Sequence, residues 1–122
     1  MPTILSYRPD NFRDRASEVY YGFHRVRQGW VYREYAPQAK ELYLAGEFNN
    51  WDWSSHPMMA LGGGNWVLFL PGEEALWEGC KVKLRIDGVE MLPRKALRCG
   101  SGKNWFGRIE NCLEPAIRTN AF

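Results

Sequence analysis

The sequence predicts an all-β protein that folds as a β-sandwich. Residues 80–87 alternate between apolar and charged side chains, the period-2 pattern of a strand with one buried face and one wet face. Turn-forming residues recur at a spacing of roughly ten, as expected for short antiparallel strands. The runs between them are rich in aromatic and β-branched residues, which favour pleated structure. A chain of 122 residues has the size of one domain.

Recognisable breaks separate the expected strands. The first ends at Ala36-Pro37 and the second at Gly46, since proline and glycine interrupt a ladder. A third lies between the flexible Gly62-Gly63-Gly64 and Pro71-Gly72. Asp87-Gly88 is typical of a two-residue hairpin turn between the fourth and fifth strands. The expected strands are 30–35, 41–45, 66–71, 80–87, 89–92 and 105–109, and Asn11–Asp14 could open one helical turn.

The alternation in 80–87 also predicts the core. Val82, Leu84 and Ile86 face inward and Lys81, Lys83 and Arg85 face outward. The inward partners expected on other strands are Tyr32, Leu44, Leu68 and Leu70.

Composition excludes several classes of protein. No apolar run approaches the length of a membrane span, and residues 1–6 lack the features of a signal peptide. Three cysteines, Cys80, Cys99 and Cys112, form no CxxC pair, which argues against zinc or a disulfide framework and indicates a reducing cytoplasm. Residues 81–122 carry nine basic and four acidic residues. This excess permits nucleic-acid binding, but no nucleic-acid signature accompanies it, and a solvated strand face explains it more simply.

The segment Gly46-Glu-Phe-Asn-Asn-Trp51 carries most of the functional information. It holds a tryptophan at a sharp turn directly after a strand. A flat indole can cover the C–H face of a pyranose ring while the adjacent amides, such as that of Asn50, hydrogen-bond its hydroxyls. The alternative is that Trp51 is a core residue near a turn, because tryptophan is usually largely buried.

The wider sequence resembles a known family. Tyr20-Tyr-Gly-Phe-His-Arg25 and the block from Trp30 to Trp51 resemble the N-terminal family 48 carbohydrate-binding module of 1,4-α-glucan branching enzymes. The turn is also similar to that of the glycogen-binding domain of the AMP-activated kinase β subunit. The resemblance covers about residues 18–111 and implies an immunoglobulin-like β-sandwich, flanked by a lead-in (1–17) and a tail (112–122).

The resemblance also implies site residues. Lys83 matches a lysine that bonds a glucose hydroxyl, through its spacing from Asp87-Gly88, and Asn104 matches a sugar-contacting asparagine. Glu90 stands where glycogen-binding relatives have a second platform tryptophan, so half of that platform is missing. Trp53 is a candidate substitute. The expected carbohydrate-binding residues are Trp51, Asn50, Lys83, Trp53 and Asn104.

No catalytic, metal or cofactor site is expected. Glu34 and Asp52 could be imagined as a glycosidase pair, but carboxylates in strands and turns are usually solvated. The two histidines, His24 and His56, have no ligand at metal spacing.

We therefore expect a non-catalytic, cytoplasmic module that binds α-1,4-glucan oligosaccharide or glycogen, with neither nucleic acid nor membrane as partner. It would be the N-terminal part, or a free-standing relative, of a branching enzyme whose catalytic barrel lies outside this chain. The main alternative is an interaction domain that has lost sugar binding and packs on a catalytic barrel or a partner protein. A glycogen-sensing regulatory module and a nucleic-acid binder are the remaining alternatives.

Overall fold

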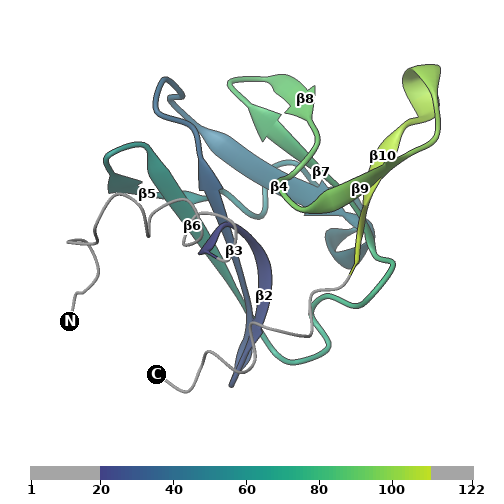
Figure 1. Cartoon of the computed structure of the whole chain (residues 1–122), viewed down its shortest axis with the longest axis horizontal. Coiled ribbons are helices and arrows are strands. Elements are labelled where there is room, and N and C mark those ends of the chain that lie inside the picture. The colour runs from purple at the N-terminus through teal and green to yellow at the C-terminus, as the bar shows by residue number, and fades with distance from the viewer. Residues whose placement is uncertain (1–19, 111–122) are drawn as a thin grey trace, which may run out of the picture.

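A computed structural model describes residues 20–110, which form two antiparallel sheets (Figure 1). One sheet has the order β2-β3-β6-β5, and the other has the order β4-β7-β10-β9 with β8 paired to β7. The strands are β2 (Gly22–Val26), β3 (Gly29–Tyr35), β4 (Leu42–Gly46), β5 (Met59–Gly62), β6 (Asn65–Pro71), β7 (Lys81–Ile86), β8 (Val89–Met91), β9 (Ala96–Cys99) and β10 (Phe106–Ile109), with 3-10 turns η1 (Glu47–Asn49) and η2 (Gly102–Asn104).

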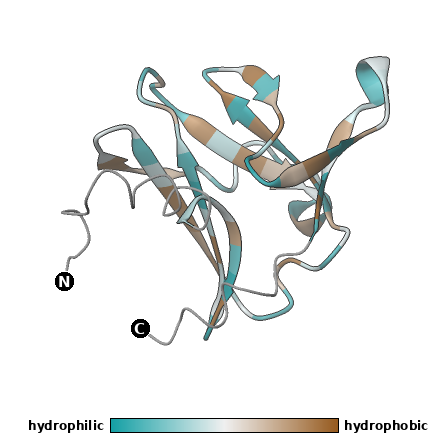
Figure 2. Cartoon of the chain, in the orientation of Figure 1, coloured by the Kyte–Doolittle hydropathy of each residue, from teal (hydrophilic) through white to brown (hydrophobic). Residues whose placement is uncertain are grey.

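The core between the sheets confirms the predicted strand register. Val82 and Leu84 are buried, and Ile86 packs against the same cluster from the end of β7. Figure 2 shows hydrophobic bands interrupted by hydrophilic ones along the strands of both sheets. The predicted partners Tyr32, Leu44, Leu68 and Leu70 are all buried. The predicted immunoglobulin-like β-sandwich is therefore correct.

All six predicted strands are present, and no bound differs from the prediction by more than one residue. The Asp87-Gly88 hairpin is confirmed: Ile86 pairs with Val89, and both turn residues have left-handed φ angles of 50° and 86°. The sequence pattern did not indicate β2, β5 or β9. The expected helical turn at Asn11–Asp14 lies outside the described residues.

The strands that pair with β7 determine where Lys83 lies in its sheet. β4 pairs with one edge of β7 from Val82 to Ile86. The other edge is divided, because β10 pairs with Lys81 and Val82 whereas β8 pairs with Leu84 to Ile86. The β7–β8 and β9–β10 hairpins extend to separate tips in Figure 1. Lys83 therefore lies where the two partner strands diverge.

Candidate functional site

The turn after β4 is built by its own hydrogen bonds. The Asn49 side chain accepts a bond from the Gly46 amide at 3.0 Å, and the Trp51 amide donates to the Gly46 carbonyl at 2.9 Å. Asn49 also donates to Ser55 Oγ at 3.0 Å, so its amide is occupied within the turn. Asn50 and Trp51 adopt left-handed φ angles of 58° and 57°. The turn thus holds these two residues in a fixed, uncommon conformation.

Both residues at the apex of the turn are accessible. Trp51 is 37% exposed and Asn50 is exposed. Within the part of the chain described, the Asn50 side chain makes no hydrogen bond. The expectation that Trp51 is at least partly exposed is confirmed, and the alternative that it is a core residue is wrong.

Strand pairing places the turn beside Lys83. Ala45 pairs with Lys83 and Gly46 with Val82, so the last residues of β4 lie next to the start of β7. A side chain at Gly46 would not fit, because an added Cβ would lie 2.2 Å from the Lys81 carbonyl oxygen. Glycine at this position lets the turn and β7 approach closely.

Lys83 belongs to a network of charges and rings. Its Nζ lies 3.0 Å from Glu90 Oε1 and 4.6 Å from the centre of the Trp105 ring. Arg85 Nη2 lies 3.1 Å from Glu90 Oε2, and its guanidinium carbon lies 4.1 Å from the centre of the Trp53 ring. The hydrogen bond from Lys83, followed by that from Arg85, lowers the pKa of Glu90.

This network changes the interpretation of two predicted residues. Lys83 is not a freely solvated lysine, since its side chain is only 16% exposed and its ammonium group is held by Glu90. Trp53 has one ring face against Arg85, which limits it as a second stacking surface. Sequence reasoning missed Arg85, Trp105 and the pairing role of Glu90. The only signal for them was the outward set of cations on residues 81–85.

Asn104 lies at a different place from the turn. It ends η2 at the tip of the β9–β10 hairpin and is exposed. Its backbone amide donates to the Ser101 carbonyl at 2.9 Å. Asn104 joins the site only through its neighbour Trp105, which contacts Lys83.

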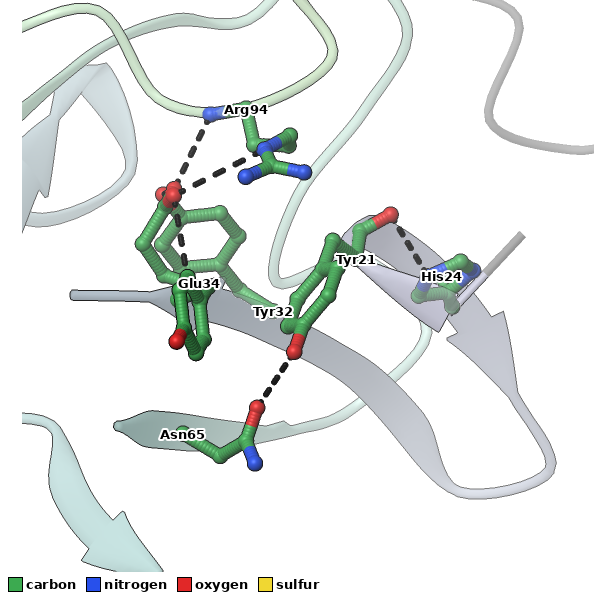
Figure 3. Close-up of polar contacts among 7 residues, drawn as sticks. Tyr21, His24, Tyr32, Glu34, Asn65 and Arg94 are labelled. Carbon is green, nitrogen blue, oxygen red and sulfur yellow. Dashed lines mark hydrogen bonds and ion pairs between the residues drawn. The ribbon is translucent and has the colours of Figure 1, made fainter. Parts of the chain in front are cut away.

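Figure 3 shows the polar contacts of Glu34 with Tyr32 and Arg94. This buried carboxylate accepts hydrogen bonds from the Tyr32 hydroxyl and, at 3.1 Å, from the Arg94 backbone amide. Arg94 Nε lies 3.8 Å away. Burial, together with the charge of Glu34, raises the pKa of Tyr32. Glu34 therefore ties β3 to the connection before β9.

Asp52 lies in the exposed turn and caps Ser54, accepting bonds from its amide at 2.9 Å and its hydroxyl at 2.7 Å. These bonds lower the pKa of Asp52. The expectation that both carboxylates are solvated is wrong for Glu34, which is buried, and each of the two is occupied by separate local contacts.

The histidines and cysteines also have local partners. His24 Nε2 donates to the Tyr20 carbonyl at 2.7 Å, and burial lowers the His24 pKa. His56 Nδ1 lies 2.7 Å from Ser55 Oγ. Burial raises the pKa of the Cys80 thiol to about 11.

Within residues 20–110 no group of three histidine, cysteine or carboxylate side chains could hold a metal ion. No helix in this part of the chain is long and apolar enough to cross a membrane.

Comparison with known proteins finds similarity to 1,4-alpha-glucan-branching enzymes. A stretch of 69 residues, 53% of this chain, is 42% identical to 10% of a 1,4-alpha-glucan-branching enzyme from Dictyostelium discoideum. The match to the 1,4-alpha-glucan-branching enzyme 2-2, chloroplastic/amyloplastic, of Arabidopsis thaliana is 43% identical over 70 residues. It covers 54% of this chain and 9% of that protein. The match to the branching enzyme of Emericella nidulans is 34% over 102 residues, which is 79% of the chain and 14% of that protein.

The chain thus spans about a tenth of the length of these relatives. A family model described as carbohydrate-binding module 48, the isoamylase N-terminal domain, matches residues 20–102. That range contains the turn with Trp51, both sheets up to β9, and Lys83 with its partner Glu90, whereas Trp105 lies beyond it. With most of its length under this model, the chain belongs to carbohydrate-binding module family 48.

Proposed function

We propose that this chain is a non-catalytic module that binds α-1,4-glucan, with Trp51 as its stacking surface. The observation that carries the proposal is an indole 37% exposed on a turn whose backbone is locked left-handed. The printed names of the matched relatives, 1,4-alpha-glucan-branching enzymes, support an α-1,4-glucan as ligand.

The proposed polar contacts come from Asn50, Lys83 and Asn104. The Asn50 amide can both donate to and accept from sugar hydroxyls beside the indole. Lys83 has three N–H donors, one of which is directed to Glu90, so others can reach a hydroxyl. Asn104 would add a contact from the η2 tip, and Trp53 would flank the sugar by its ring edge. This is a small set of contacts, so we expect a dissociation constant on the order of 1 mM.

The proposed setting is a longer polypeptide or a free-standing relative of one. In a branching enzyme the catalytic barrel would carry the chemistry, and this module would help to dock glycogen or starch beside it. Within residues 20–110 both cysteines, Cys80 and Cys99, are free, which supports a cytoplasmic location. We infer that the isolated chain has no transferase activity on amylose. A shift in the iodine–glucan spectrum produced by the purified chain would contradict this inference.

The Glu90–Lys83 ion pair favours a second candidate function, an interaction domain that has lost sugar binding. Electrophoresis in native gels with glycogen, with starch and without polymer separates the two. Retardation by either polymer that is lost in Trp51→Ala supports glucan binding. Unchanged migration in every gel supports the interaction domain.

A further inference from the structure

A continuous row of contacts crosses the outer face around β7, from the tryptophan turn to β9. We call it the cationic strip. The Arg85 guanidinium carbon lies 4.1 Å from the centre of the Trp53 ring, and Glu90 lies 3.1 Å from Arg85 Nη2 and 3.0 Å from Lys83 Nζ. Lys83 Nζ and the Arg98 guanidinium carbon each lie 4.6 Å from the centre of the Trp105 ring. The members of the strip, in order, are Trp53, Arg85, Glu90, Lys83, Trp105 and Arg98.

The strip holds more positive than negative charge. Glu90 is shared between Lys83 and Arg85, so one carboxylate faces two cations. Arg98 is exposed and lies against the Trp105 ring, and within residues 20–110 it has no ion pair. The Nε of Arg85 is buried and has no hydrogen-bond partner among the described residues. Three cations and one carboxylate leave a net excess of positive charge.

The aromatic rings fix the positions of these cations. Lysine and arginine side chains normally lose considerable rotamer freedom when they bind a ligand. Here the head groups of Lys83, Arg85 and Arg98 already rest on Trp105 or Trp53, so less freedom remains to be lost. A neutral sugar gains no charge–charge attraction from this excess of positive charge, whereas an anionic group on the sugar is attracted to it.

We propose that the cationic strip binds phosphate monoesters carried by an α-glucan, an inference that rests on the proposed function. Trp53 belongs both to the strip and to the turn that presents Trp51, so a glucan bound at the turn can extend toward the strip. Guanidinium groups bind phosphate oxygens in a bidentate manner, which suits the exposed Arg98.

The charge around the strip favours an isolated phosphate over a long polyanion. Residues 41–80, which include the turn, contain six acidic residues and no lysine or arginine. A nucleic acid that followed the strip onto the turn would approach Glu47 and Asp52. A glucan with sparse monoesters places charge over the strip alone.

The test compares one amylopectin batch, phosphorylated enzymatically, before and after phosphatase treatment. We expect the phosphorylated polymer to bind about tenfold more tightly at low salt, with the gain shrinking as salt screens the charges. Arg98→Gln should reduce the gain to about threefold or less and leave binding of the dephosphorylated polymer unchanged. Arg27→Gln, which removes another exposed arginine, from the β2–β3 turn, should behave like wild type.

The outcomes separate this inference from the proposed function. Equal affinity for the two polymers overturns the phosphate site and leaves glucan binding intact. No binding of either polymer overturns the proposed function itself, and the phosphate inference with it. Tighter binding of single-stranded DNA than of the phosphorylated polymer, or an equal loss in Arg27→Gln, would show general anion attraction and also overturn the phosphate site.

Discussion

At Trp51 the backbone and the side chain point to the same role. A left-handed φ of 57° is unfavourable for a large residue, by about 1–2 kcal/mol. The hydrogen bond from the Trp51 amide to Gly46 holds this conformation. Strained residues that the surroundings fix in this way concentrate at functional sites. The turn conformation leaves the Trp51 indole 37% exposed, in keeping with the stacking role proposed for it.

Replacing Trp51 by alanine should weaken glucan binding and leave stability nearly unchanged. By analogy with base stacking on aromatic residues, the loss in binding should be about 1–3 kcal/mol. Titration with maltoheptaose and thermal unfolding measure the two effects. Trp77→Ala removes another exposed tryptophan, 44% accessible, and should retain wild-type binding. Equal binding by Trp51→Ala and wild type would contradict the role given to Trp51.

Leu84 tests the core at the residue scale. It is 1% exposed and lies on the inward face of β7. Leu84→Ala should lower the free energy of unfolding by roughly 2–5 kcal/mol, as for other buried leucines. Leu97→Ala, at a side chain 48% exposed on β9, should change it by less than about 0.5 kcal/mol. Similar values from denaturant unfolding of the two variants would mean that the register of β7 is wrong.

The Trp51 turn depends on the close contact between β4 and β7. Gly46 has an extended φ of 177°, so alanine there meets no backbone strain. Its Cβ would instead lie 2.2 Å from the Lys81 carbonyl oxygen and 2.9 Å from Val82 Cγ1. Gly46→Ala should therefore separate the strands, lower stability by about 1–3 kcal/mol and displace the Trp51 turn.

Gly102→Ala is the comparison variant, because no atom lies within 4 Å of its added Cβ and only its left-handed φ of 55° opposes alanine. We expect Gly46→Ala to lose maltoheptaose binding as well as stability. Gly102→Ala should lose about 1 kcal/mol of stability and keep binding. Retained binding in a destabilised Gly46→Ala would show that the turn does not depend on this contact.

The β7–β8 turn is tied to the start of β4 by Asp87. Its Oδ1 accepts the backbone amides of Lys40 at 2.8 Å and Glu41 at 2.9 Å. These bonds lower the pKa of Asp87, first through Glu41 and then through Lys40. A carboxyl whose pKa is lower in the folded state stabilises the fold above its unfolded pKa of about 3.9 and loses that effect as the pH falls through the folded value.

Unfolding of wild type and Asp87→Asn should therefore diverge with pH. Near pH 7 wild type should be the more stable, because its carboxylate is charged and accepts both amides. Between about pH 4 and the lowered pKa of Asp87, the difference in unfolding free energy should shrink. A difference that stays constant from pH 7 to pH 3 would mean that the Asp87 charge contributes nothing.

At the scale of the whole molecule, the sequence predicts elements with a clear pattern and misses those set by their partners. The alternation in 80–87 is a local property, so β7 and its inward face were predictable. β5 is exposed along its whole length, and β9 has no inward-outward alternation. Both are strands because they pair with β6 and β10, which no local pattern shows.

The candidate site also has one part that the sequence predicts and another part that it does not. The Trp51 turn and the outward position of Lys83 follow from short motifs. The contacts of Lys83 with Glu90 and Trp105 depend on how β8 and β10 diverge from one edge of β7, which is a property of the sheet. Sequence reasoning therefore located the lysine but not the charge that holds it.

The most direct test of glucan binding is a titration of the isotope-labelled chain with maltoheptaose, followed by amide and indole NMR signals. We expect saturable shifts concentrated at residues 50–53, at Lys83 and at the Trp51 indole N–H, with a dissociation constant on the order of 1 mM. A cello-oligosaccharide of equal length should give much smaller shifts, because its flat chain does not follow the curved α-glucan surface. Absence of saturable shifts, or saturable shifts confined to the β2-β3-β6-β5 sheet, would contradict the proposed site.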